Sequence, residues 1–308
     1  VCSSDLNVSN HWTGHLALFS AQLIYALNYS IAKDLMPELL HPFTLVFFRI
    51  TGAGLLFWIA GVFVRSEKME PADYIKLFKL CLLGVVFNQF FFITGLCYTT
   101  PINSALIMIT SPILVFFLGI ILNREPLRWN VITGLALAMT GALLMLLFKG
   151  HFQWGSETLA GDLMTVINAC SWSLFLIYSK PLLFKYHTLT VMKWLFLFGF
   201  IISCPLGLSR INEIHLQDFN LYSWLSLGFV VIATTFLAYL LNVMGLKRLN
   251  AVTTGAYIFL QPFLASWVAY LLGKDALNTI KLLSGLCILG GLSLIHFHTF
   301  TNKSHETR

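Results

Sequence analysis

Residues 101–147 read PINSALIMITSPILVFFLGIILNREPLRWNVITGLALAMTGALLMLL, and residues 251–297 follow the same pattern at an offset of 150. In both stretches a proline lies inside a long apolar run, a basic and an acidic residue follow, and a second apolar run contains small residues. A repeat of this length indicates a duplicated structural unit, which sets the architecture of the whole chain. The matched positions are Pro112 and Pro262, Arg124 and Lys274, Glu125 and Asp275, Leu127 and Leu277, and Gly141 and Gly291.

The composition is typical of a membrane protein. Of the 308 residues, 57% are apolar and 10% are charged, whereas soluble domains carry roughly 25% charged residues. Runs of about 20 apolar residues are what an α-helix needs to cross a bilayer, and these runs do not alternate as the strands of a membrane β-barrel do. They predict an all-α membrane protein with ten transmembrane helices. The runs lie at 14–33, 43–64, 77–97, 101–122, 129–149, 159–179, 189–209, 222–246, 251–272 and 280–300.

The repeat extends to the first three helices of each half. Because five is an odd number, the second half must enter the membrane from the side opposite to the first. This predicts two inverted five-helix repeats around a central cavity, with substrate bound near the bilayer midplane. The predicted boundaries are 12–149 for the first repeat, 150–300 for the second, and 1–11 and 301–308 for two cytoplasmic tails.

The basic residues predict the orientation. With both termini on one side, that side holds thirteen lysine and arginine residues and the other holds five, while Arg49 lies within a helix. Positive charge gathers on the cytoplasmic side, so both termini are expected there, in a bacterial inner membrane. The net charge of +6 therefore does not indicate a nucleic-acid partner. The run at 14–33 lacks a basic segment before it and a small-residue cleavage site after it, so we expect a retained span, and residues 1–6 are left out of the fold.

Landmarks in both halves resemble one family. Each half opens with a helix that has a glycine at its start, an aromatic residue in its middle and a lysine at its end: Gly14, Tyr25 and Lys33, and then Gly161, Trp172 and Lys180. Together with the proline-interrupted fourth helix and the glycine-containing fifth, this order resembles the EamA-type branch of the drug/metabolite transporter superfamily. The resemblance implies an exporter or permease of small metabolites, with a cavity lined chiefly by helices 1, 3, 4, 6, 8 and 9. Asp275 departs from the family, which usually shows glutamate there.

Polar side chains are concentrated in those same helices. Polar groups are expensive in hydrocarbon, so we expect them to face a water-filled cavity, with hydrogen bonding between helices as the alternative. In the first run they recur at helical spacing and share one face, which carries Gln22, Tyr25, Asn28 and Tyr29. The predicted cavity residues are Tyr25, Asn28, Asn88, Gln89, Asn103, Asn168, Trp172, Tyr239, Asn242, Tyr257 and Gln261.

Four residues are candidates for gating or hinge movement. Arg49 lies inside the second helix, and it either anchors or gates the helix or contacts the substrate directly. Lys193 is its counterpart in the second half. Pro112 and Pro262 each remove a helical hydrogen bond and free the carbonyl four residues earlier, that of Met108 or Ile258. These prolines predict kinks that either serve as hinges or admit polar side chains.

The function predicted from these features is secondary transport by alternating access. Amides combined with aromatic rings suit a small amphipathic solute, so amino acids or similar metabolites are expected as the substrate. A nucleotide-sugar or phosphate-ester exchanger, with Lys247-Arg248 as its anion site, and a membrane scaffold that transports nothing are the alternatives. An intramembrane enzyme would need a titratable or metal-binding group inside the membrane, and the sequence offers no convincing one. No catalytic residue, metal or cofactor is therefore predicted.

Small residues follow one face of the fifth and tenth helices. Gly134, Ala138 and Ala142 are spaced by four, as are Cys287 and Gly291. Such faces let helices approach closely, so they either pack the fifth helix against the tenth, which is favoured, or support a homodimer. The remaining predicted partners are a small-molecule substrate and the lipid bilayer.

Overall fold

The computed structural model describes residues 3–64, 67–123, 126–149, 155, 157–214, 216–273 and 278–301, which contain helices, turns and no strand. The paired charges Arg124-Glu125 and Lys274-Asp275 lie outside this part of the chain. The helices are α1 (Ser3–Asp34), α2 (Pro42–Val62), α3 (Pro71–Cys81), η1 (Leu82–Phe87), α4 (Asn88–Tyr98), α5 (Pro101–Met108), α6 (Ser111–Asn123), α7 (Trp129–Lys149), α8 (Leu159–Lys185), α9 (Thr188–Leu208), η2 (Ile211–Glu213), η3 (Leu216–Asp218), α10 (Leu221–Gly228), η4 (Phe229–Leu237), α11 (Ala238–Arg248), α12 (Ala251–Ala256), η5 (Tyr257–Phe259), α13 (Leu260–Leu271) and α14 (Thr279–Thr301).

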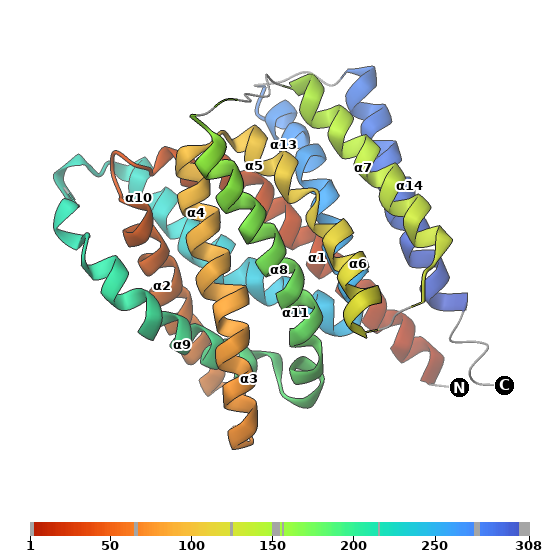
Figure 1. The fold of residues 1–308 in the computed structure, drawn as a ribbon, viewed down its shortest axis with the longest axis horizontal. Coiled ribbons are helices and arrows are strands. Elements are labelled where there is room, and N and C mark those ends of the chain that lie inside the picture. The colour runs from red at the N-terminus through yellow and green to blue at the C-terminus, as the bar shows by residue number, and fades with distance from the viewer. Residues whose placement is uncertain are drawn as a thin grey trace.

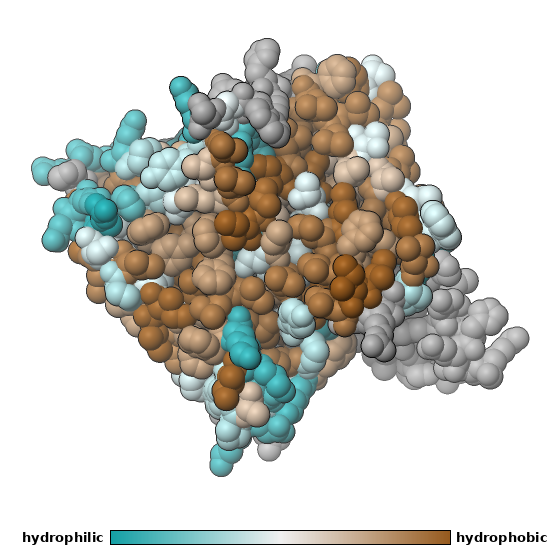
Figure 2. All heavy atoms as spheres, in the orientation of Figure 1, coloured by the Kyte–Doolittle hydropathy of each residue, from teal (hydrophilic) through white to brown (hydrophobic). Residues whose placement is uncertain are grey.

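The outer surface of the bundle is apolar. Large side chains such as Leu55, Ile121 and Leu286 are more than half exposed, and Figure 2 shows an apolar surface with hydrophilic side chains gathered near α10 and near the start of α3. Within the described residues, nine helical segments are long and apolar enough to cross a membrane. The tenth is α1, whose 32 residues exceed the length of a span. Polar residues on its inner face lower its hydropathy.

The third and eighth helices each contain a wide, π-helical stretch. The first runs through α3, η1 and α4, and the second through α10, η4 and α11. A π-helical turn bonds residue i to i+5, so it leaves backbone carbonyls free for other donors, and such turns are frequent at functional sites. Neither stretch was predicted, because Leu82–Phe87 and Phe229–Leu237 are ordinary apolar runs in the sequence.

The fourth and ninth helices are interrupted just before their prolines, as predicted. α5 ends at Met108 and α6 begins at Ser111, next to Pro112. In the ninth helix the 3₁₀ segment η5 separates α12 from α13 ahead of Pro262. Proline cannot donate to the carbonyl four residues back and clashes with it, which accounts for both interruptions.

The two halves pack by exchanging partners (Figure 1). α1 of the first half packs against α11 of the second, and α8 of the second packs against α4 of the first. α2 likewise pairs with α9, and α7 with α14. Each pair maps onto another, or onto itself, when the halves are interchanged. The fold is therefore a membrane bundle of two inverted five-helix repeats, as predicted.

Small residues bring α7 and α14 together. A Cβ atom added to Gly291 would lie 2.5 Å from the carbonyl oxygen of Gly134 and 2.6 Å from the amide nitrogen of Ala138. The two backbones are thus in direct contact, which glycine and alanine permit. The predicted packing of the fifth helix against the tenth is confirmed.

Candidate functional site

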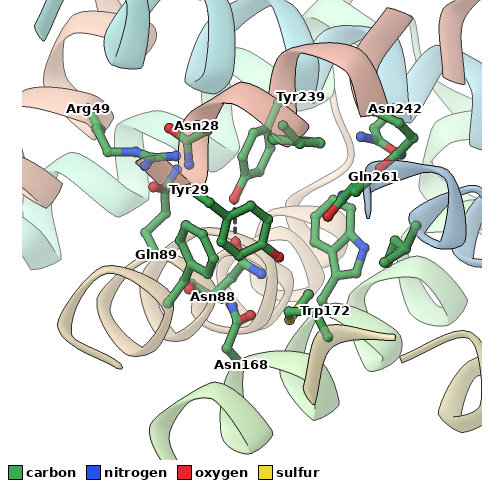
Figure 3. Close-up of a pocket in the computed structure, with 15 residues that line it drawn as sticks. Asn28, Tyr29, Arg49, Asn88, Gln89, Asn168, Trp172, Tyr239, Asn242 and Gln261 are labelled. Atoms are coloured by element: carbon green, nitrogen blue, oxygen red, sulfur yellow. Dashed lines mark hydrogen bonds between the residues drawn. The ribbon is translucent and has the colours of Figure 1, made fainter. Parts of the chain in front are cut away.

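A cavity lies in the middle of the bundle, where the irregular helices meet (Figure 3). The centres of water molecules can occupy a volume of about 70 Å³ in it. One water needs roughly 10–15 Å³ by this measure, so the space fits a small solute. The lining side chains are Gln22, Tyr25, Asn28, Tyr29, Arg49, Asn88, Gln89, Phe92, Met108, Asn168, Trp172, Tyr239, Asn242, Ile258 and Gln261.

One wall of the cavity joins α1 to α13. Four polar residues of α1 face inward because they recur at helical spacing. The amide nitrogen of Gln261 donates a 2.6 Å hydrogen bond to Oε1 of Gln22. This bond links the first helix of one half to the ninth helix of the chain, so it crosses between the repeats.

The opposite wall depends on carbonyls in and beside the π-helical stretch η1. Tyr239 donates its hydroxyl proton to Oδ1 of Asn88 at 2.6 Å and approaches the carbonyl of Gly84 at 3.1 Å. Asn168 donates from Nδ2 to the carbonyl of Asn88 at 2.7 Å. Ser171 bonds the carbonyl of Leu83 at 2.6 Å. These contacts fix the orientation of the amides that face the cavity.

Removing the Tyr239 hydroxyl tests this wall. In Tyr239→Phe, Oδ1 of Asn88 loses its donor in a half-buried site, and the loss of one hydrogen bond typically costs about 0.5–1.5 kcal/mol. We expect a lower unfolding temperature in detergent and weaker substrate binding. Tyr222→Phe serves as the control, because its exposed hydroxyl bonds Asp34 away from the cavity. Equal effects of the two substitutions would contradict the assignment.

Arg49 extends into the cavity from α2. Its side chain is 2% exposed, and its Nε and Nη1 atoms have no hydrogen-bond partner among the described residues. Tyr25 and Tyr239 are close enough to interact with the guanidinium electrostatically, and Figure 3 shows Asn28 and Gln89 beside it. None of the described residues that line the cavity is acidic. The positive charge therefore faces the cavity without an acidic counter-charge among these lining residues.

Most of the predicted cavity residues line this cavity, but Asn103 and Tyr257 do not. Asn103 lies in the first turn of α5, near the end of the bundle, and its side chain approaches the carboxylate of Asp162 at 3.4 Å. Tyr257 belongs to η5, and its hydroxyl is 2.7 Å from Nδ1 of His15 on α1. Both lie on the expected helices, yet their positions along and around the helix axis direct them to other partners.

The cavity also contains residues that were not among the predicted set. Gln22 and Tyr29 follow from the helical spacing of α1. Met108 and Ile258 each lie four residues before a proline, and their carbonyls were predicted to be freed by it. That position relative to proline could have identified both as cavity residues. Phe92 carried no such signal. Of the predicted gating residues, Arg49 lines the cavity, whereas Lys193 places its Nζ atom 5.3 Å from the ring of Trp58.

A polar cluster closes one end of the bundle beside the cavity helices. Lys33, at the end of α1, donates from Nζ to the carbonyls of Leu96 at 2.7 Å, Cys97 at 2.7 Å and Thr99 at 3.0 Å. The hydroxyl of Thr99 in turn donates to Asp162 at 2.5 Å. The last carbonyls of a helix lack partners within it, so a lysine here stabilises the end of α4.

An apolar helical bundle with a cavity between interrupted helices, into which amide, hydroxyl and guanidinium groups project, fits a membrane transporter. The sequence matches the EamA-like transporter family over residues 12–147 and 159–297. The chain therefore belongs to the EamA family of transporters.

Relatives agree with this assignment. An uncharacterized transporter of Archaeoglobus fulgidus is 25% identical over 295 residues, which cover 95% of this chain and 98% of that protein. The uncharacterized transporter YetK of Bacillus subtilis is 24% identical over 78% of this chain and 76% of its own length. The Arabidopsis thaliana protein WALLS ARE THIN 1 is 26% identical over 61% of this chain and 57% of its own. One protein of known crystal structure has the same fold. Its TM-score to this chain is 0.75, at 19% sequence identity, and the match covers 94% of this chain and 99% of that one.

Proposed function

We propose that this protein is a secondary transporter of small amphipathic metabolites, amino acids or similar solutes, which works by alternating access. The observation that carries the proposal is the cavity, where amide groups and the rings of Trp172 and Tyr239 surround a space for a small solute. Such a lining offers hydrogen bonds to a polar head and an apolar surface to the rest of the molecule.

The charge of the cavity favours this solute class over phosphate esters. Arg49 is the one cation among the described lining residues, whereas phosphate recognition usually draws on clustered arginine and lysine. Lys247, suggested by sequence as part of an anion site, lies at the end of α11 and donates to the carbonyl of Tyr186 at 3.3 Å. A phosphate-ester exchanger is therefore the less favoured alternative.

The orientation belongs to the same proposal. The excess of positive charge on one side supports placing both termini in the cytoplasm of a bacterium, with the protein in the inner membrane. Export is the proposed direction. Because no acidic side chain is among the described cavity residues, we propose facilitated transport or exchange without a proton relay.

Flux in liposomes tests the function. The full chain is reconstituted into vesicles loaded with a mixture of radiolabelled amino acids, and release is compared with protein-free vesicles. We expect release of a subset of the amino acids, unchanged by an imposed pH gradient. Release of sugar phosphates with no release of any amino acid would overturn the proposed substrate class, and strong dependence on the gradient would overturn the coupling.

A further inference from the structure

The guanidinium of Arg49 is a buried cation for which the described lining residues provide no anion. A charged group in the interior of a membrane protein is costly unless it is paired, and its partner is usually another charged group or backbone carbonyls. Two of its nitrogens lack any hydrogen-bond partner among the described residues, and the side chain is 2% exposed. Its charge is thus held within the cavity, where a ligand can reach it.

The surroundings of Arg49 define what that ligand can be. Tyr25 and Tyr239 line the same cavity, and a neutral hydroxyl group does not cancel the charge of the guanidinium. A single guanidinium balances one negative charge, and its planar donors match the two oxygens of a carboxylate. A phosphate ester would leave further negative charge unpaired in a site with no second cation among the described residues.

An unpartnered acceptor elsewhere in the cavity suits the other end of such a ligand. Oδ1 of Asn168 is buried and has no hydrogen-bond partner among the described residues, whereas Asn28 lies beside Arg49 itself (Figure 3). Asn168 is fixed in this orientation, because its Nδ2 donates to the carbonyl of Asn88. Unpaired buried acceptors favour a ligand that brings N–H or O–H donors, such as an ammonium group.

We propose that Arg49 is the carboxylate-binding residue of the cavity, so that the transported solute must carry a carboxylate, with a donor group held by Oδ1 of Asn168. The proposal rests on the transport function proposed above and adds the group that the solute must have. It also assigns to Arg49 direct contact with the substrate, one of the two roles left open by the sequence.

Binding to the detergent-purified full chain tests this assignment without transport. The probes are the proteinogenic amino acids, each compared with its carboxamide, and 4-methylpentanoate, which is leucine without its amino group. We expect thermal stabilisation by one or more carboxylates and none by the matched carboxamides. In Arg49→Met, affinity for the stabilising amino acid should fall by roughly 100-fold or more, because the pairing charge is lost. Arg49→Lys should recover part of that affinity.

The matched control is Arg210→Gln. This arginine is exposed and pairs with Glu213 at 2.6 Å outside the transmembrane helices, so its loss should leave binding unchanged. Equal stabilisation by a carboxamide, undiminished binding by Arg49→Met, or no stabilisation by any carboxylate would each overturn the proposal. If Arg49→Met fails to fold, the comparison of carboxylate with carboxamide on the wild-type chain still decides.

Liposome flux separates this inference from the transport function. Binding of carboxylates without any flux would support the carboxylate site but contradict the proposed transport function. Flux of a solute that has no carboxylate, at the same rate in Arg49→Met as in the wild type, would support the transport function but contradict the carboxylate site.

Discussion

Gly291→Ala is expected to lower the stability of the folded bundle by about 2–3 kcal/mol, the cost of overpacking a close contact. The new methyl group would lie 2.5 Å from the carbonyl oxygen of Gly134 and 2.6 Å from the amide nitrogen of Ala138. Both are backbone atoms, so no rotamer change can relieve the clash, and α7 and α14 must separate. The measurement is the unfolding temperature of the purified protein in detergent, together with the amount of folded protein recovered.

The adjacent glycine provides the control. A Cβ atom added to Gly290 would meet only Cδ2 of Leu137, at 3.6 Å, which is ordinary van der Waals contact. Gly290→Ala should therefore leave the unfolding temperature unchanged or raise it slightly, since alanine has the higher helix propensity. Similar losses in both variants would mean that the region does not tolerate substitution in general, and would contradict the role of the α7–α14 contact.

Lys33→Met is expected to cost about 2–3 kcal/mol, because the ammonium group donates to three carbonyls at the end of α4 and a charge-assisted hydrogen bond is stronger than a neutral one. Methionine keeps the length and apolar stem of the side chain but leaves those carbonyls unpaired. The cluster that holds α1, α4 and α8 together at this end should then open more readily. Transport should change together with thermal stability, since these three helices also line the cavity.

Lys68→Met is the matched control for this substitution. Lys68 precedes α3 and is exposed, so its replacement removes the same charge without disturbing the cluster. We expect its unfolding temperature and flux to match the wild type. If Lys33→Met behaved in the same way, the three short contacts to the end of α4 would contribute nothing measurable, and the cluster would not be a stabilising element.

The placement of the helices was predictable because a bilayer imposes it. A span needs about 20 apolar residues, and every run of that kind became a helix. The inner faces were predictable for the same reason, since Tyr25, Asn28 and Asn168 are too polar to face lipid. Membership of the correct helix was not sufficient, however. Asn103 and Tyr257 lie on cavity helices but face Asp162 and His15.

The irregular turns explain what the sequence did not reveal. The stretch Leu82–Phe87 is an ordinary apolar sequence, yet it forms a π-helical turn whose carbonyls accept hydrogen bonds from Ser171 and Tyr239. These donors come from other helices, so the contacts arise only in the folded bundle. The unpaired state of Arg49 is likewise a property of the assembled cavity, since it depends on which neighbours fail to reach the guanidinium.

Because helices of one half pack against helices of the other, the two repeats are not expected to fold separately in a membrane. α1 rests on α11, and α8 rests on α4, so each half covers the polar face of the other half's first helix. A half produced alone would turn Gln22 or Asn168 toward lipid. Two halves produced as separate chains would still carry all the surfaces they need to reunite. Each half of the duplication therefore depends on the other half to keep its polar helix face away from lipid.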